Sequence, residues 1–427
     1  MLRRVVIPIV LLAAMLAPPS ARASDNGVED PKVAIAGVRM ADDHVMKIDI
    51  ATSGLGAGAL EWPTVALTVW LDGVPAHAAL PLIHMPSRFT MDMDLPAGLV
   101  RVAGVVVGDF KPIPRFEENL RFPIEVTVSH GPRASTARTM ATILLPTVVV
   151  PGYLNEMGGL PGDVLTVFRR HGYLEAGTAQ TLFWLTYHSQ VVTLEQGAQA
   201  LDAYVRQVVL PASYAKKINV IGYSFGGLMA RWNLAYVDGW GTLVNRLVLI
   251  GVPNEGSTMA YVWRHAPSFL PFSGLGRTPA IRTLTPTFPF WRSRAGDQWT
   301  AAPDGRDGVL DRLNAQPIPR GVRVYVFYGS HDPRDSAGPR TAVGVTGELP
   351  AATLSFAPGD GVVLADSAQG LPINGGAGVP ALAERTVLRV NLGSVYHTGL
   401  LQAGADRMAD ALTDRYFNSV DETSPDE

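Results

Sequence analysis

Cysteine is absent from the 427-residue chain. Its absence excludes disulfide bonds, thiolate nucleophiles, zinc–thiolate sites, iron–sulfur clusters and a lipid-modified N-terminal cysteine. Charge is also scarce and balanced, because 35 Lys and Arg stand against 38 Asp and Glu without a long basic run. Nucleic-acid binding is therefore not expected. Any catalysis has to come from Ser, His, Asp, Glu or the backbone.

Long hydrophobic runs are missing except at the N-terminus. Arg3 and Arg4 precede an apolar stretch over residues 5–17, and a small-residue sequence A-R-A follows at 21–23. These are the three parts of a cleavable signal peptide, predicted for residues 1–23. The stretch is short for a bilayer span, so an uncleaved anchor is the weaker alternative. We expect a secreted or periplasmic protein, with a disordered acidic tail over residues 419–427.

Up to about residue 145 the chain consists of short alternating runs separated by turn residues. This pattern predicts an antiparallel β-sandwich of immunoglobulin-like type over residues 24–142. Nothing in this region groups His, Asp or Glu at ligand spacing, so a structural or surface-binding role is expected. The runs that carry the prediction cover residues 33–40, 45–50, 65–71, 89–95, 100–107 and 122–128.

From residue 147 onward, β-rich runs alternate with helical patterns. Such alternation predicts a parallel sheet with crossover helices over residues 143–418. The Gly-Pro pair at 131–132 suggests two separable modules, so a fragment starting near Arg133 is expected to fold by itself. The predicted strands cover residues 147–150, 181–186, 218–221, 247–250, 322–328 and 387–390, and a helix is predicted over 194–209.

The strongest chemical signal is the sequence G-Y-S-F-G from Gly222 to Gly226, which follows a β-branched run and precedes a helical one. The pattern G-x-S-x-G is a nucleophile elbow, in which glycines permit a sharp turn from strand to helix. Ser224 is therefore the predicted nucleophile. A Gly-rich turn with a solvent-facing Ser is the weaker alternative.

A serine nucleophile needs a base and a carboxylate that orients the base. After a nucleophile elbow the three residues follow the chain order Ser, acid, His. Only His331 and His397 lie far enough beyond Ser224 to be the base. His397 lies in a loop after the last predicted strand and is the predicted base, whereas His331 lies where the acid is expected. For the acid, the residues leave three candidates: Asp332, by proximity to the preceding strand, Asp360, in a G-D-G loop, and Asp366.

Acyl transfer also needs two backbone N–H groups for the developing oxyanion. The residue after the nucleophile supplies one, which assigns Phe225. The loop V-V-V-P-G-Y-L-N over residues 148–155 can supply the other, and Tyr153 N–H is the predicted donor. An ordinary Pro-Gly turn is the alternative for this loop.

Taken together, these motifs resemble the α/β-hydrolase lipases and esterases, in particular their lecithin:cholesterol acyltransferase-like branch. The resemblance covers residues 145–415, implies an α/β-hydrolase fold, and favours Asp360, because that branch places its carboxylate in the later G-D-G-type loop. The chain lacks the cysteines of the animal enzymes and hence their disulfide-pinned lid. The segments that carry the resemblance cover residues 150–156, 222–231, 249–257, 284–290, 310–314, 328–329 and 359–363.

An insertion over about residues 257–313 is predicted to form an aromatic-rich cap. An aromatic cap suits an acyl chain or an apolar alcohol, although some of these rings are expected merely to pack the cap. Residues 261–299 contain eight aromatic residues: Tyr261, Trp263, Phe269, Phe272, Phe288, Phe290, Trp291 and Trp299.

The sequence thus predicts an exported serine hydrolase of carboxylic, lipid-like esters that needs no cofactor and no metal. Acyl transfer to an alcohol through the same acyl-enzyme, and a non-catalytic exported binding protein on a hydrolase scaffold, are the alternatives. Expected partners are an ester or lipid substrate and a lipid or polymer surface, with no obligate protein partner.

Overall fold

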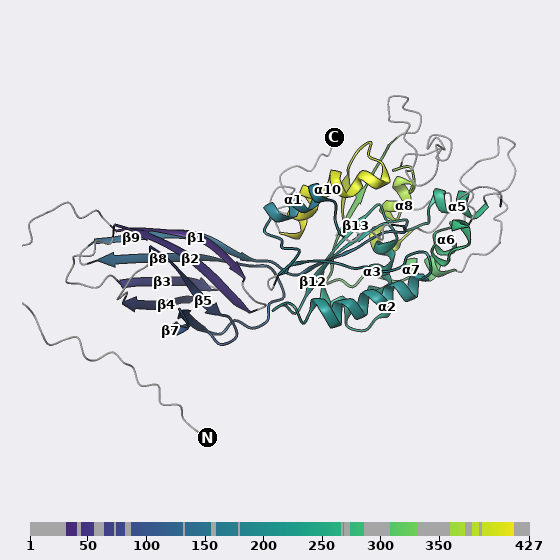
Figure 1. Cartoon of the computed structure of the whole chain (residues 1–427). Helices are drawn as coiled ribbons and strands as arrows, with labels where there is room; N and C mark the ends of the chain where they lie inside the picture. Colours follow the sequence, from purple (N-terminus) through teal and green to yellow (C-terminus); the bar gives the residue numbers. More distant parts are fainter. Residues whose placement is uncertain are drawn as a thin grey trace, which may run out of the picture.

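The computed structural model describes two domains that lie end to end, an antiparallel β domain and an α/β domain (Figure 1). The described residues are 31–40, 44–54, 64–71, 74–81, 87–130, 133–154, 159–177, 180–265, 268, 274–285, 308–331, 359–371, 378–383 and 387–413. The predicted signal peptide and acidic tail lie outside them.

The N-terminal domain is one continuous antiparallel sheet in the order β1-β2-β5-β6-β7-β4-β3-β8-β9. Along β2, alternate residues are buried, among them Met46, Ile48 and Ile50, as expected for a strand with one face on a core. The strands are β1 (Lys32–Met40), β2 (Val45–Ser53), β3 (Thr64–Leu71), β4 (Val74–Pro81), β5 (Arg88–Asp94), β6 (Leu99–Val102), β7 (Val105–Asp109), β8 (Leu120–His130) and β9 (Arg133–Ile143).

The sheet folds over so that its edge strands β1 and β9 meet, and Val33 N–H donates to Ser135 Oγ at 3.3 Å. The predicted antiparallel β domain is therefore confirmed, and its immunoglobulin-like type stays an interpretation. The single run predicted over residues 100–107 is wrong. Ala103 and Gly104 have φ angles of 48° and 81° and turn the chain between β6 and β7.

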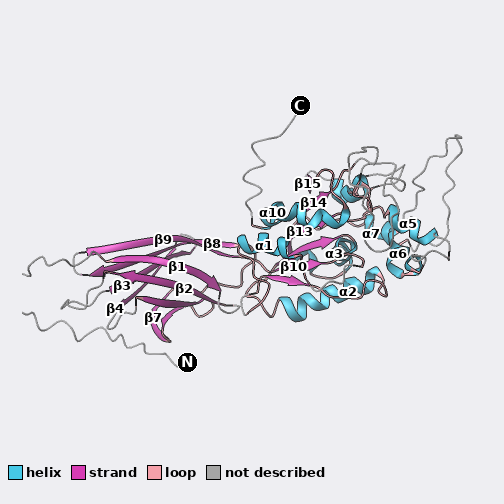
Figure 2. Ribbon diagram, turned by 45° about the horizontal axis from the view of Figure 1, so that its top comes forward, coloured by secondary structure: helices cyan, strands magenta, loops and turns pink. Residues whose placement is uncertain are grey.

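The second domain contains the predicted parallel sheet, in the order β11-β10-β12-β13-β14-β15. Every residue of β10, β12 and β13 is buried, because helices cover both faces of the sheet (Figure 2). This is the arrangement of the predicted α/β-hydrolase fold. The strands are β10 (Thr147–Val150), β11 (Leu182–Trp184), β12 (Ile218–Tyr223), β13 (Val244–Ile250), β14 (Arg323–Tyr328) and β15 (Val387–Asn391).

Two apolar clusters hold the helices on the sheet. One cluster joins α1 (Gly162–Arg170) and α10 (Leu400–Leu412) to one face of the sheet, and the other joins α2 (Leu194–Tyr204) and α3 (Phe225–Tyr236) to the opposite face. The predicted helix over 194–209 ends as a π-helical turn over Val205–Val209. The remaining helices are α4 (Trp240–Leu243), α5 (Thr258–His265), α6 (Pro279–Leu284), α7 (Val309–Asn314), α8 (Ala365–Gln369) and α9 (Pro380–Ala383).

Helices α5 and α6 belong to the predicted cap. Of its eight aromatic residues, only the side chain of Trp263 is described, so the aromatic character of the cap is not tested. None of the helices in the described ranges combines the length and the apolar character needed to cross a bilayer.

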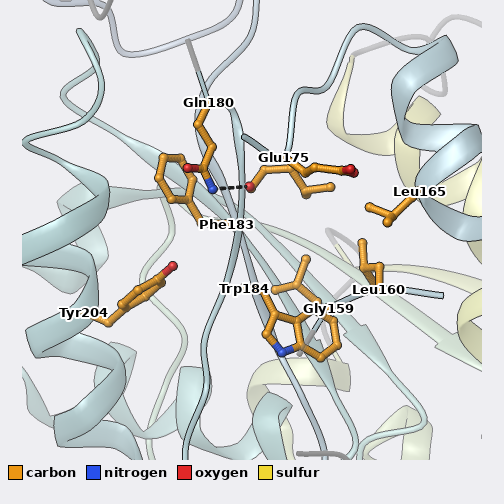
Figure 3. Close-up of a pocket in the computed structure, with 10 residues that line it drawn as sticks. Gly159, Leu160, Leu165, Glu175, Gln180, Phe183, Trp184 and Tyr204 are labelled. Atoms are coloured by element: carbon orange, nitrogen blue, oxygen red, sulfur yellow. Dashed lines mark hydrogen bonds between the residues drawn. The ribbon is translucent and has the colours of Figure 1, made fainter. Parts of the chain in front are cut away.

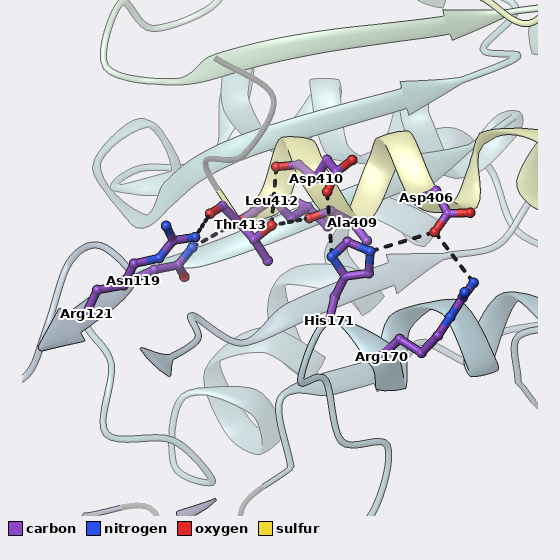
Figure 4. Close-up of polar contacts among 9 residues, drawn as sticks. All are labelled: Asn119, Arg121, Arg170, His171, Asp406, Ala409, Asp410, Leu412 and Thr413. Atoms are coloured by element: carbon purple, nitrogen blue, oxygen red, sulfur yellow. Dashed lines mark hydrogen bonds and ion pairs between the residues drawn. The ribbon is translucent and has the colours of Figure 1, made fainter. Parts of the chain in front are cut away.

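The two domains share polar contacts at the end of α10 (Figure 4). Asn119 Nδ2 donates to Leu412 O at 2.8 Å, and Arg121 of β8 donates to Thr413 O. Asn119 Oδ1 in turn accepts from Leu145 N–H at 2.8 Å. These side chains satisfy carbonyl groups that the end of a helix leaves without intrahelical partners. The β domain therefore caps a helix of the α/β domain.

Apolar and backbone contacts extend this junction. Ala215 of the α/β domain is buried in the core cluster of the β domain, together with Ile143 and Leu145. Lys216 N–H donates to Phe116 O at 2.8 Å. Strand β9 begins at Arg133 and pairs with β8 along its whole length. These contacts argue against the expectation that the hydrolase separates at Arg133, because the cut removes the partner strand of β9 and leaves this core open.

Candidate active site

Ser224 occupies the turn between β12 and α3 with φ 52° and ψ −123°. A non-glycine residue with positive φ is strained and is frequent at functional sites. The flanking glycines make the turn feasible: a Cβ on Gly222 would lie 2.4 Å from Gly227 Cα, and one on Gly226 would lie 2.3 Å from Val150 O. The predicted elbow is therefore present, and it presents Ser224 at the carboxyl end of the sheet.

The loop after β10 lies directly against the nucleophile. A Cβ on Gly152 would lie 2.7 Å from Ser224 Cβ, so only glycine permits this approach. Leu154 has φ 61°, and its N–H donates to the buried Ser189 Oγ at 2.9 Å. Tyr153, between these two residues, lines the same cavity as Ser224. Phe225 is the first residue of α3, where N–H groups have no intrahelical partner.

Asp360 and His397 form the central polar contact of the site. Asp360 Oδ2 lies 2.7 Å from His397 Nδ1. The other carboxylate oxygen, Oδ1, accepts from the N–H groups of Val362 at 3.0 Å and Val363 at 2.7 Å. Asp360 is 1% exposed and His397 8% exposed. A carboxylate held in this way orients the imidazole and leaves Nε2 as the nitrogen for proton transfer.

Tyr223 and Gly251 fix the position of His397. The Tyr223 ring stacks on the imidazole at 5.1 Å between centroids, and its hydroxyl donates to His397 O at 2.9 Å. Burial, reinforced by the charge of Asp360, raises the pKa of Tyr223, which stays a neutral donor. A Cβ on Gly251 would lie 3.0 Å from His397 Cε1 and 3.1 Å from Asp360 Oδ2, so this glycine gives the pair its room.

The other acid and base candidates lie elsewhere. Asp366 is exposed in the first turn of α8, and Asp332 lies outside the described residues. His331 Nδ1 lies 2.5 Å from Ser394 Oγ, and its ring contacts Tyr396 rather than a carboxylate. The structure thus brings Asp360, not Asp366, to His397.

Ser224 and His397 line one cavity of about 350 Å³. Such a volume is typical of a small-molecule site. Its walls are mainly apolar and come from the cap helices and from the ends of α1 and α10. The lining includes Tyr153, Leu160, Met259, Ala260, Trp263, Ile281, Leu284, Val363, Thr398 and Leu401. The site can hold an apolar acyl group next to a serine hydroxyl.

A buried network around Arg231, which the sequence did not reveal, supports the loops of the site. Arg231 Nη1 donates to Asn254 Oδ1 at 2.6 Å, and Nη2 donates to Asn314 Oδ1 at 3.0 Å. Asn254 Nδ2 donates to Ala368 O at 2.8 Å, so the network joins α3 to the segment after Asp360. These residues lie in the motifs that carry the family resemblance, but their separation along the chain hides the contacts.

Burial lowers the pKa of Arg231 to about 10, a fall that the charge of Glu255 partly offsets. We expect Arg231→Ala to lower the free energy of unfolding by about 3–5 kcal/mol, because the amide oxygens of Asn254 and Asn314 lose their donor and Glu255 its counter-charge. Arg206→Ala, at a 45% exposed arginine paired with Asp202, should cost less than about 1 kcal/mol. Urea unfolding measures both, and equal losses would contradict the network.

Comparison with known proteins yields structural similarity only. No protein-family model and no curated protein matches the chain. The mature form of a Bacillus licheniformis lipase is 14% identical with a TM-score of 0.43, over 63% of this chain and 91% of that one. Aspergillus fumigatus lipase B is 16% identical with a TM-score of 0.37, over 64% of this chain and 53% of its own.

A metagenomic carboxyl esterase is 14% identical with a TM-score of 0.35, over 76% of this chain and 84% of that one. The chain spans about half the length of the Aspergillus lipase. It is thus similar in structure, at low sequence identity, to proteins named as lipases and esterases.

Proposed function

We propose that this protein is an exported serine hydrolase that cleaves carboxylic esters with apolar acyl groups. The observation that carries the proposal is the 2.7 Å contact of Asp360 with His397, which lines the same cavity as Ser224. The signal-peptide pattern supports export. The immunoglobulin-like type of the β domain, the aromatic cap and the relation to the lecithin:cholesterol acyltransferase-like branch are parts of the same proposal.

In the proposed reaction, Ser224 Oγ attacks the ester carbonyl carbon while His397 Nε2 takes the hydroxyl proton. Asp360 stabilises the imidazolium, and the N–H groups of Phe225 and Tyr153 bind the oxyanion. When the tetrahedral intermediate collapses, the C–O bond to the alcohol breaks and His397 protonates the leaving oxygen. Water, deprotonated by His397, then attacks the acyl-enzyme, and the acid is released as Ser224 regains its proton.

Three measurements test this proposal. A fluorophosphonate should label the wild type at Ser224, and no labelling would favour a non-catalytic binding protein. Hydrolysis rates across esters of one alcohol with acyl chains from short to long should rise with chain length until the cavity is filled, because the walls are apolar. Product analysis with an added alcohol separates hydrolysis from acyl transfer.

The acid can be tested separately from the nucleophile. We expect Asp360→Asn to lower kcat by about 10³ to 10⁴, because the amide favours the wrong His397 tautomer. Asp366→Asn, at an exposed carboxylate six residues further on, should change kcat less than about tenfold, and so should Asp332→Asn. A larger loss in Asp332→Asn than in Asp360→Asn would move the acid to the earlier loop.

A further inference from the structure

The loop that carries Tyr153, the proposed oxyanion donor, is held by two side chains from the segment after β11. The Tyr187 hydroxyl donates to Pro151 O at 2.9 Å, and Ser189 Oγ accepts from Leu154 N–H at 2.9 Å. These two side chains are buried, with 7% and 0% of their surface exposed. They lie behind the loop, outside the lining of the active-site cavity.

The two hydrogen bonds hold the peptide groups on either side of the proposed donor. Pro151 O belongs to the peptide group before the one that joins Gly152 to Tyr153, and Leu154 N–H belongs to the group after it. Because each residue has only two soft backbone dihedrals, holding both neighbouring groups leaves few ways to turn the Tyr153 N–H. An oxyanion donor is effective only when it points to the place where the charge develops.

Each bond acts where the loop is strained or crowded. Leu154 has φ 61°, a conformation that persists in a non-glycine residue only when its surroundings hold it. The Ser189 hydroxyl supplies such a restraint. On the other side, Pro151 O lies against the elbow, since a Cβ on Gly226 would lie 2.6 Å from it. The Tyr187 hydroxyl thus holds this carbonyl next to the start of α3, which carries the other proposed donor.

The segment that provides both side chains follows a strand that is itself fixed. Strand β11 pairs with β10, and Leu185 N–H donates to Val149 O at 3.0 Å just beyond the paired residues. On the outer side of β11, Gln180 Nε2 donates to Leu182 O at 2.8 Å (Figure 3). The Tyr187 ring belongs to the apolar cluster that holds α2 and α3 on the sheet. The loop is therefore attached to the core of the domain.

We propose that Tyr187 and Ser189 are positioning residues, which orient the oxyanion donor through the backbone of the loop. The inference rests on the proposed ester hydrolysis and goes beyond it, because neither side chain touches the reacting atoms. Donors that are already in place need no reorganisation when the charge develops. Loss of a restraint therefore weakens binding of the oxyanion and leaves binding of the uncharged ester unchanged.

The test uses the full-length protein with two readouts, hydrolysis of a soluble ester and inhibition by an alkyl trifluoromethyl ketone. Ser224 Oγ adds to the ketone carbon, its proton passes to His397, and an electron pair of the carbonyl double bond becomes an oxyanion. The adduct resembles the transition state, so its affinity reports the oxyanion site. For an ester whose chemistry is slow, KM reports binding of the substrate itself.

We expect Tyr187→Phe and Ser189→Ala each to lower kcat about tenfold, to leave KM within about twofold, and to raise the Ki of the ketone by the factor by which kcat/KM falls. Both residues act through one donor. The double variant should therefore lose no more than the factor of about 10² to 10³ that removal of one oxyanion donor causes. Tyr187→Phe removes a single oxygen atom and decides the test if Ser189→Ala folds poorly.

Two control variants remove matched hydroxyl groups elsewhere. Tyr214→Phe deletes a hydroxyl that donates to Ile113 O at 2.9 Å, at the junction of the two domains. Thr181→Val deletes a hydroxyl that accepts from Leu174 N–H at 2.9 Å, directly before β11. Both controls should leave kcat and the Ki of the ketone unchanged, even if they lower the free energy of unfolding.

The possible results are distinguishable. Parallel losses in kcat and in affinity for the ketone, in both variants and in neither control, support the positioning role. Unchanged kcat in Tyr187→Phe, a rise in KM alone, or a fall in kcat with unchanged Ki overturns it while ester hydrolysis stands. A wild type that neither cleaves the ester nor reacts with a fluorophosphonate refutes the proposed function itself.

Discussion

Replacing Ser224 with alanine is expected to lower kcat for ester hydrolysis by about 10⁴-fold or more, and His397→Ala should do the same. The two residues act on one proton: the hydroxyl is a weak nucleophile without the imidazole, and the imidazole has no catalytic partner without the hydroxyl. The double variant should therefore be scarcely slower than either single variant. Steady-state hydrolysis of a soluble ester measures all three.

A fold-preserving control makes this result specific. Ser257 lines the same cavity, and its hydroxyl donates to Val362 O at 2.7 Å rather than to His397. Ser257→Ala should keep kcat within about tenfold, and near-UV circular dichroism should show an intact fold in every variant. Turnover close to the wild type in Ser224→Ala would refute the assignment of the nucleophile.

The parallel sheet and its elbow could be predicted from the sequence because their pattern is local. Strand β12 is buried on both faces, so residues 218–221 are apolar except for Asn219. The glycines of the elbow are needed for steric reasons that involve near neighbours in the sequence, such as Gly222 against Gly227. Local signals of this kind do not depend on knowing the rest of the fold.

The strands of the β domain were harder to predict where one face meets solvent. Strand β9 contains Arg, Ser and Thr, and most of its residues are exposed or half-buried, so no apolar run marks it. Its existence depends on pairing with β8 along its whole length. The Gly-Pro pair at 131–132 suggested a boundary between two modules, whereas the pairing makes residues 133–143 a strand of the β domain.

The acid of the site shows the limit of local reasoning. The residues alone left Asp332, Asp360 and Asp366 open, because the loop that follows a strand can return to the site at any of several points. Only the folded chain brings Asp360 next to His397, 37 residues away. The contact of Asn119 with Leu412, 293 residues away, has no sequence signal at all.

Removal of the β domain is expected to abolish soluble, active protein. A fragment that starts at Arg133 keeps β9 but loses β8, and it uncovers Ile143, Leu145 and Ala215, which are buried in the core of the β domain. It also leaves the last carbonyls of α10 without Asn119 and Arg121. Exposed apolar surface next to an unpaired strand is prone to aggregation.

The measurement compares solubility, near-UV circular dichroism and hydrolysis of a small soluble ester between this fragment and the full chain. A fragment that is soluble and within about tenfold of full-length activity would contradict the prediction.

A point variant isolates the capping contact from the loss of the whole domain. Asn119→Ala should lower the free energy of unfolding by about 1–3 kcal/mol, because Leu145 N–H and Leu412 O both lose a partner. Arg138→Ala, at a 77% exposed arginine of β9 paired with Glu125, should cost less than about 1 kcal/mol. If the domains unfold as one unit, urea gives a single transition that Asn119→Ala shifts as a whole. Two separate transitions, of which the one for the α/β domain is unchanged in Asn119→Ala, would show that the α/β domain does not depend on the β domain.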